Sequence, residues 1–208
     1  MSAAPFSDGA RTWDQRFAAD DYLFGREPNE YLRAQAPLLP AAGRALCVAD
    51  GEGRNSVWLA KQGLQVDAFD ISAVGVAKAQ KLATEMRVAV QYVVTSSEAF
   101  AWPLQTYDLV AGIFFQFADA TERERLFRQM VDALKPGGLL VLQGYTPPQL
   151  AYNTGGPKEL SHMYTAALLQ EAFNALQMLD LREYEADLNE GARHVGRSAL
   201  VGMVARKR

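Results

Sequence analysis

A glycine-rich turn with two carboxylates, ADGEGRNS, follows an apolar run and precedes a helical pattern. Its carboxylates are Asp50 and Glu52, and its glycines are Gly51 and Gly53. Glycine lets a backbone approach a ligand closely or adopt a positive φ, and the first strand-to-helix turn of an open α/β sheet borders the ligand site. The glycine spacing alone is a weak version of a dinucleotide fingerprint. We therefore predict a small-molecule site at this turn.

The acidic side chains of the turn bear on which ligand it accepts. A dinucleotide places its pyrophosphate at the helix N-terminus, where the dipole and free N–H groups favour an anion. Asp50 and Glu52 would add like charge there, whereas S-adenosylmethionine has no phosphate and carries a sulfonium and an ammonium. The turn thus favours the methyl donor over NAD. Asn55 can cap the helix that begins nearby and is included among the predicted cofactor-binding residues.

Polar residues also end the next two apolar runs. The second run ends in Asp70, where a carboxylate can accept both hydroxyls of a ribose. Adenosyl ligands and NAD share that ribose, so Asp70 marks an adenosine site without choosing between them; the alternative is a helix N-cap. Ser96, Ser97 and Glu98 follow the third run, at the height of an adenine edge. The alternative for these three residues is an ordinary polar loop.

Strand-like and helix-like patterns alternate from about Arg44 onward. Expected strands at 45–49, 65–71, 88–94, 107–115 and 138–145 are separated by helical patterns at 56–63, 73–86 and 120–135. This rhythm predicts a doubly wound, Rossmann-like α/β fold with five parallel strands and helices on both faces.

The end of the chain departs from that rhythm. A helix over 165–177 precedes strands over 178–188 and 198–207, which only a short, mainly polar stretch separates. No crossover helix fits there, so we predict an antiparallel hairpin and a seven-stranded sheet. The glycine-rich segment 152–160 belongs on the ligand side of the sheet, either as a closing lid or as an ordinary connection.

The predicted organisation is a single domain over 1–208 with a helical preface. Residues 1–43 are rich in aromatic and charged residues, and residues 44–208 form the core. The plain interpretation of the preface is a cap that packs on the sheet edge. The functional interpretation is a lid over the strand ends.

Composition excludes several classes of protein. The net charge is −3 and no Lys/Arg-rich run is present, so nucleic acid is not an expected partner. The single cysteine, Cys47, excludes an intramolecular disulfide. No apolar run is long enough to cross a bilayer, and the N-terminus has no signal-like apolar region. We expect a soluble, cytoplasmic monomer or homodimer.

Four motifs, ADGEGRN, VDAFDIS, YDLVAGIFFQF and ALKPGGLLVLQGY, occur in this order before the hairpin. Together they resemble the class I S-adenosylmethionine-dependent methyltransferases over nearly the whole chain. The preface is similar to that of the tellurite-resistance and thiol or thiopurine methyltransferases. The chain departs from the family pattern at three positions. The family usually has an acidic residue at the position of Cys47, a glycine at that of Ala49 and an aspartate at that of Ser96.

The resemblance implies roles for individual residues. Asp50, Gly51 and Gly53 would lie along the methionine and ribose of the cofactor, while Asp70 would bind the ribose hydroxyls and Ile71 would pack on the adenine. The remaining implied positions are Ser97 and Glu98 at the adenine edge, Phe114 and Phe115 around the methyl group, and Arg16 at the cofactor carboxylate. An exposed helix ion pair is the alternative for Arg16.

Methyl transfer is an in-line displacement at the sulfonium carbon, so the protein mainly supplies alignment and a dry site. A soft nucleophile such as a thiolate or selenide needs little acid–base help, which agrees with the lack of a catalytic triad, HExxH or metal-ligand motif. We expect a small-molecule acceptor with a sulfur, selenium or tellurium nucleophile, and S-adenosylhomocysteine as product. Oxygen and nitrogen acceptors stay open.

A general base, if one is used, would come from a short set of residues. The candidates are Tyr22, His162 and His194, and Arg193 beside His194 could meet an anionic substrate. Packing is the alternative for Tyr22, and a solvated turn is the alternative for His194. The competing functions are an NAD-binding oxidoreductase and a non-catalytic relative that binds S-adenosylmethionine or S-adenosylhomocysteine.

Overall fold

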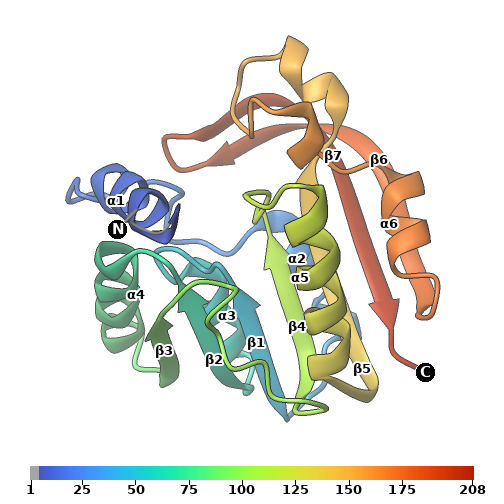
Figure 1. The fold of residues 1–208 in the computed structure, drawn as a ribbon. Helices are drawn as coiled ribbons and strands as arrows, with labels where there is room; N and C mark the ends of the chain where they lie inside the picture. Colours follow the sequence, from blue (N-terminus) through green and yellow to red (C-terminus); the bar gives the residue numbers. More distant parts are fainter. Residues whose placement is uncertain (1–4) are drawn as a thin grey trace.

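The structure is a computed structural model that describes residues 5–208; residues 1–4 of the predicted preface lie outside the described residues. Within that range the strands form one seven-stranded sheet in the order β3-β2-β1-β4-β5-β7-β6 (Figure 1). Strands β1 to β5 run parallel, and the β6–β7 hairpin joins the sheet through antiparallel pairing of β7 with β5. This topology confirms the predicted doubly wound sheet with its terminal hairpin.

The strands begin and end close to the expected positions. Their bounds are β1 Arg44–Val48, β2 Gln65–Asp70, β3 Val90–Val94, β4 Tyr107–Ile113, β5 Leu134–Tyr145, β6 Gln177–Glu190 and β7 His194–Arg206. Successive side chains of a strand point to opposite faces. In β1, Leu46 and Val48 therefore join the core beneath one face, and Ala45 and Cys47 join the core beneath the other.

Helices cover both of these apolar faces. Helices α5 and α6 pack on the face of Leu46, and α2, α3 and α4 lie on the face of Cys47. The bounds are α1 Pro5–Arg16, α2 Glu30–Ala34, α3 Arg54–Lys61, α4 Ala73–Glu85, α5 Ala120–Ala133 and α6 Ala166–Ala172, with short 3-10 turns η1 Ala36–Leu38, η2 Pro147–Ala151 and η3 Leu160–His162. None of the described helices is long and apolar enough to cross a membrane.

The hairpin extends further than the sequence pattern predicted. Its pairing continues to Glu190 opposite His194, so only Gly191, Ala192 and Arg193 form the turn. Gly191 adopts a φ of 67°, a left-handed conformation that glycine tolerates. The assignment of His194 to a solvated turn is therefore wrong: this residue is the first of β7, and its side chain is buried.

The N-terminal segment lies against the carboxyl ends of β1 and β2. Helix α1 contacts α4 (Figure 1). The Asp14 carboxylate accepts hydrogen bonds from Ser72 Oγ (2.5 Å) and Val74 N (3.1 Å) at the start of α4. Phe17, just after α1, is buried against the glycine turn. The segment thus occupies the place that a cap or a lid requires.

Candidate functional site

The glycine turn between β1 and α3 adopts left-handed backbone conformations. Gly51 has a φ of 60° and Gly53 a φ of 92°. A Cβ added to Gly51 would lie 3.2 Å from the Phe17 ring, and one added to Gly53 would lie 2.6 Å from the Cβ of Ala79. Both glycines are thus required by backbone conformation and by close packing within the protein. Ala49, where the resembling family has glycine, is held at a φ of 50°, which stores local strain.

Asp70 is held in one orientation at the end of β2. Its Oδ2 accepts a hydrogen bond from Gly51 N (2.8 Å), and its Oδ1 accepts one from Ser72 N (2.8 Å). Burial raises the pKa of this carboxyl, and the backbone N–H groups oppose the shift. The side-chain cap of α4 is Ser72, whose Oγ accepts from Gly75 N (2.9 Å), so the N-cap alternative for Asp70 is wrong. A carboxylate has about four acceptor positions, so Asp70 keeps acceptor capacity for a ligand.

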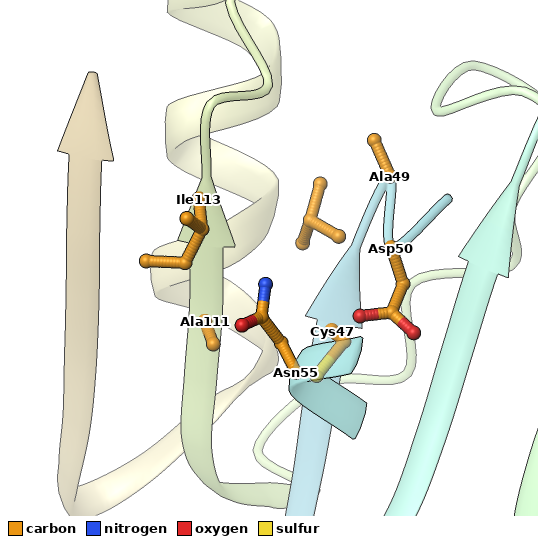
Figure 2. Close-up of a pocket in the computed structure, with 7 residues that line it drawn as sticks. Cys47, Ala49, Asp50, Asn55, Ala111 and Ile113 are labelled. Atoms are coloured by element: carbon orange, nitrogen blue, oxygen red, sulfur yellow. The ribbon is translucent and has the colours of Figure 1, made fainter. Parts of the chain in front are cut away.

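A small cavity of about 10 Å³ lies between the ends of β1 and β4 (Figure 2). Its lining includes Cys47, Asp50, Asn55 and Ile113. The Asp50 carboxylate accepts hydrogen bonds from the N–H (3.3 Å) and the hydroxyl of Ser56. Burial raises the pKa of Asp50 to about 7, and burial also raises that of the Cys47 thiol. Protonated Asp50 is therefore well populated at neutral pH.

Glu52 is engaged by partners within the protein. Its side chain is buried; Oε1 lies 2.5 Å from Lys78 Nζ, and Oε2 accepts a hydrogen bond from Leu23 N (2.7 Å). The charge of Glu52 is thus balanced inside the protein. The expectation that both carboxylates of this turn repel a phosphate is therefore wrong for Glu52. For Asp50 the raised pKa weakens the expectation, because a protonated carboxyl carries no charge. Local sequence does not reveal these long-range partners.

The turn after β3 is organised by its own polar groups. Ser96 Oγ accepts a hydrogen bond from Ala99 N (3.1 Å), and the Ser97 carbonyl accepts one from Trp102 Nε1 (2.7 Å). Glu98 is exposed and lies 3.4 Å from Arg125. These contacts match the polar-loop alternative, and the adenine-edge role of Ser96, Ser97 and Glu98 stays a prediction.

Two further predicted residues lie at or near helix α1. A Cβ added to Gly9 would lie 3.4 Å from the Cδ1 of Ile71, so α1 packs close to this half-buried side chain. Arg16 is exposed, and its guanidinium lies 4.7 Å from the centre of the Trp13 ring. This cation–π contact replaces the helix ion pair that was the alternative for Arg16.

The loop after β4 separates the two predicted phenylalanines. Phe114, at a φ of 53°, places its ring centre 4.7 Å from that of Tyr145 and 4.4 Å from that of His194. Phe115 is instead fully buried in the core against Phe127. The prediction that Phe115 surrounds the methyl group is therefore not supported, because adjacent residues point to opposite sides of the chain at this position.

His194 differs from the other candidate bases in its surroundings. The residue is 7% exposed, and its ring packs against that of Phe24 at 4.4 Å between centres. Burial lowers its pKa, so the imidazole is neutral near pH 7, and Nδ1 lies 3.7 Å from Glu190 Oε2 with no hydrogen-bond partner in the described residues. Tyr22 donates its hydroxyl to the carbonyl of Lys78 (3.1 Å), and burial raises its pKa. His194 is thus the better proton acceptor.

The two remaining candidates lie closer to the surface. His162 is half-buried in η3, where its carbonyl accepts a hydrogen bond from Gln116 Nε2 (3.0 Å). Arg193 is exposed in the hairpin turn. No ion-pair partner of Arg193 occurs among residues 5–208.

Sequence reasoning missed a buried polar cluster behind His194. Asn29 donates from Nδ2 to Gln143 Oε1 (2.7 Å) and to Glu190 Oε1 (3.0 Å), and its N–H donates to Asn55 Oδ1 (3.0 Å). Arg54 lies 2.8 Å from Glu190 Oε2. The cluster joins the N-terminal segment, α3, β5 and the hairpin. No short motif could reveal it, because its members come from distant parts of the chain.

Comparison with known families gives a match at this site. Residues 45–138 match the family model described as a methyltransferase domain. The match runs from β1 into the beginning of β5 and includes the glycine turn and Asp70. Curated relatives include the ubiquinone/menaquinone biosynthesis C-methyltransferase UbiE of Salmonella arizonae, which is 37% identical over 59 residues. That stretch covers 28% of this chain and only 23% of the relative's length.

Solved structures share the fold over almost the whole chain. A structure from work on the conversion of a disulfide bond into a thioacetal group during echinomycin biosynthesis has a TM-score of 0.78 at 14% identity, covering 96% of this chain and 92% of that one. TehB from Haemophilus influenzae has a TM-score of 0.71 at 16% identity, with coverages of 96% and 67%. The N-methyltransferase NodS from Bradyrhizobium japonicum WM9, solved with S-adenosylhomocysteine, has a TM-score of 0.70 at 15% identity, with coverages of 95% and 97%.

Residues 45–138 therefore resemble a methyltransferase domain, and the chain shares the Rossmann-like fold of these solved structures. These comparisons give no support to an NAD-dependent oxidoreductase.

Proposed function

We propose that this protein is an S-adenosylmethionine-dependent methyltransferase that acts on a small-molecule acceptor. The observation that carries the proposal is the Asp70 carboxylate, which the N–H groups of Gly51 and Ser72 hold at the end of β2. An oriented carboxylate with free lone pairs suits the two hydroxyls of a ribose. The methyltransferase-domain match across the same residues supports the assignment.

The residues at the strand ends fit such a cofactor chemically. S-adenosylmethionine supplies a methyl group activated by its sulfonium. Asp70 would hold the ribose, and Asp50 and Asn55, which line the cavity at the ends of β1 and β4, would border the methionine portion. Ile71 would pack on the adenine. The proposed contacts of Arg16 with the cofactor carboxylate, and of the turn after β3 with the adenine, rest on the family resemblance.

The proposed acceptor carries a sulfur, selenium or tellurium nucleophile. Similarity to TehB supports the tellurite-resistance and thiol subgroup, and the thioacetal structure concerns chemistry at sulfur. UbiE and NodS are described as C- and N-methyltransferases, so shared fold alone does not select the acceptor atom. The aromatic side chains of Phe114, Tyr145 and Phe24 around His194 offer apolar surroundings in which a soft nucleophile reacts readily.

His194 is the proposed proton acceptor for an acceptor molecule that bears an S–H or another protic group. Its neutral imidazole would accept the proton at Nε2, while the buried Nδ1 faces Glu190 Oε2 at 3.7 Å, so that Glu190 would stabilise the imidazolium that forms. His194→Gln should lower the turnover number for a thiol at pH 7 and remove the acidic limb of the pH–rate profile. Equal rates and profiles for both proteins would exclude this role.

Calorimetry tests the cofactor directly. S-adenosylhomocysteine should bind the purified protein with measurable heat, whereas NAD should not. Binding of NAD alone would overturn the proposal. The proposal also includes a reducing, cytoplasmic location and a monomeric or homodimeric state.

A non-catalytic relative that binds the same cofactor is the second candidate. The observation that favours it is the departure at Cys47 and Ala49, where a thiol and a strained alanine replace the family's usual carboxylate and glycine. Incubation with methyl-labelled donor and a panel of thiols, selenols, phenols and amines separates the two. Label on a thiol or selenol supports the enzyme; binding of S-adenosylhomocysteine without any labelled product supports the second candidate.

A further inference from the structure

A second concave site lies between the segment after β5 and the tip of the β6–β7 hairpin. Figure 1 shows where these two segments lie in the fold. Gln149, Leu150 and residues 153–158 form one wall, and Ala192, Arg193 and Val195 form the other, around a groove of about 420 Å³. A volume of this size falls within the range of small-molecule sites. We call it the hairpin groove.

Buried hydrogen bonds hold the walls of the hairpin groove in place. Gln149 is only 1% exposed; its Nε2 donates to Thr154 Oγ1 (2.9 Å) and to the Gly155 carbonyl (3.1 Å), and its Oε1 accepts from Ala199 N (2.8 Å) of β7. Thr154 Oγ1 also donates to the Arg197 carbonyl (2.6 Å). The segment after β5 is thus fastened to β7, so the groove is formed before any ligand arrives.

All charged side chains that line the hairpin groove are positive. Lys158 and Arg193 line it, and no aspartate or glutamate does. Neither cation forms an ion pair with any residue in 5–208. Glu185, on the neighbouring β6, already bonds to Arg197 and to Tyr152 Oη. The two uncompensated cations favour an anionic ligand.

Apolar side chains complete the lining of the hairpin groove. Leu150 is 44% exposed and Val195 is 47% exposed, and both face the groove together with Pro157. Exposed apolar side chains in a groove that two uncompensated cations also line suit a ligand with an apolar body and a charged end. We propose that the hairpin groove binds a small organic anion, of the aryl or alkyl carboxylate class. The proposal goes beyond the proposed function and requires neither the cofactor nor methyl transfer.

Benzoate is a suitable probe, with neutral benzamide as its matched control. In a ¹H–¹⁵N titration of the whole chain, benzoate should shift the amide signals of Gly155, Gly156 and Ala192. Benzamide should bind about tenfold more weakly, because charge-assisted hydrogen bonds are stronger than neutral ones. Added salt should weaken benzoate binding. Equal binding of benzamide, or shifts confined to other regions, would overturn the proposal.

Two double variants separate local charge from total charge. Lys158→Gln with Arg193→Gln should lower benzoate affinity about tenfold or more. Lys61→Gln with Arg128→Gln removes the same charge from exposed positions on α3 and α5 and should leave affinity unchanged. Thermal unfolding would confirm that both variants fold, and equal loss in the two would refute the assignment. Binding of S-adenosylhomocysteine, measured in parallel, reports on the proposed function separately.

Discussion

Lys78 places its Nζ 2.5 Å from Oε1 of Glu52, and this buried ion pair fastens the N-terminal segment to the glycine turn. Nζ also donates to the carbonyls of Ala19 (2.8 Å) and Asp21 (2.7 Å), while Glu52 Oε2 accepts from Leu23 N (2.7 Å). The two side chains thus connect the turn, α4 and the polypeptide that follows α1. A carboxylate that the sequence suggests as a ligand group serves as an internal anchor.

Removing the cation of this pair should destabilise the protein strongly. Lys78→Met leaves Glu52 buried without its partner, which costs about 3 kcal/mol or more. Lys135→Met breaks a more exposed pair with Asp108 and should cost about 1 kcal/mol or less. Urea unfolding of both variants tests the difference. Equal losses in the free energy of unfolding would show that the buried Lys78–Glu52 pair contributes no more than the exposed one.

Loss of the Asp70 carboxylate should impair cofactor binding. Asp70→Ala removes the proposed acceptor of the ribose hydroxyls and should weaken S-adenosylhomocysteine affinity about 10- to 100-fold, as expected for bonds to a charged acceptor. Asp67→Ala is the matched control, because Asp67 lies on the same strand but pairs with Arg44. Calorimetry on both variants measures their affinity for S-adenosylhomocysteine. Unchanged affinity of Asp70→Ala would mean that the ribose site is elsewhere.

The buried Asp50 should make stability depend on pH. Its pKa of about 7 lies above the value of an unfolded chain, near 3.9. Its contribution to stability is therefore full below about pH 4 and is lost as pH rises through about 7. Asp50→Asn cannot ionise, so it should gain stability relative to the wild type by about 3 kcal/mol between pH 4.5 and 8.

Asp108→Asn is the control for that pH dependence. Burial tends to raise the pKa of Asp108, but hydrogen bonds from Lys135 and the Arg44 N–H hold it below its usual range. Asp108 is therefore ionised throughout pH 4.5 to 8, and the stability difference of this variant from the wild type should stay constant. Urea unfolding at several pH values gives both curves. A constant difference for Asp50→Asn would contradict the prediction.

Glu190 should be critical for the buried cluster at the hairpin. Burial opposes its ionisation, yet His194, Arg54 and the Glu30 N–H hold the pKa of Glu190 at about 2. Glu190→Gln would leave Arg54 buried without a counter-ion and should cost about 3 kcal/mol. Glu185→Gln breaks an exposed pair that solvent screens, so it should cost much less than Glu190→Gln. Thermal and urea unfolding compare them; similar losses would argue against a buried charge effect.

Much of the fold could be predicted because its determinants are local. The alternation of Ala45 and Cys47 with Leu46 and Val48 specifies a strand buried on both faces, and the short mainly polar stretch around Gly191 excludes a crossover helix. The ends of the helices and strands were predicted less accurately, because they do not depend on local sequence alone. The α6 helix ends at Ala172, several residues before the end of its helical pattern, because tertiary packing decides where an apolar run stops being helical.

The candidate site was predictable only in part. Asp70 is recognisable because its position at a strand end follows from sequence periodicity, and the structure orients it through Gly51 N–H. The partners of Glu52 and the core position of Phe115 could not be foreseen, since they depend on which helix packs over which face.

The sequence by itself determined the order of strands and helices, the glycine turn and the carboxylate that ends β2. These features depend on neighbours along the chain, where side-chain period and turn geometry act directly. Only the tertiary structure decided that Glu52 is an anchor and that Asn29 meets Glu190 across 161 residues of chain. Hydrogen bonds and ion pairs over such separations form where packing brings elements together, and no local pattern records them.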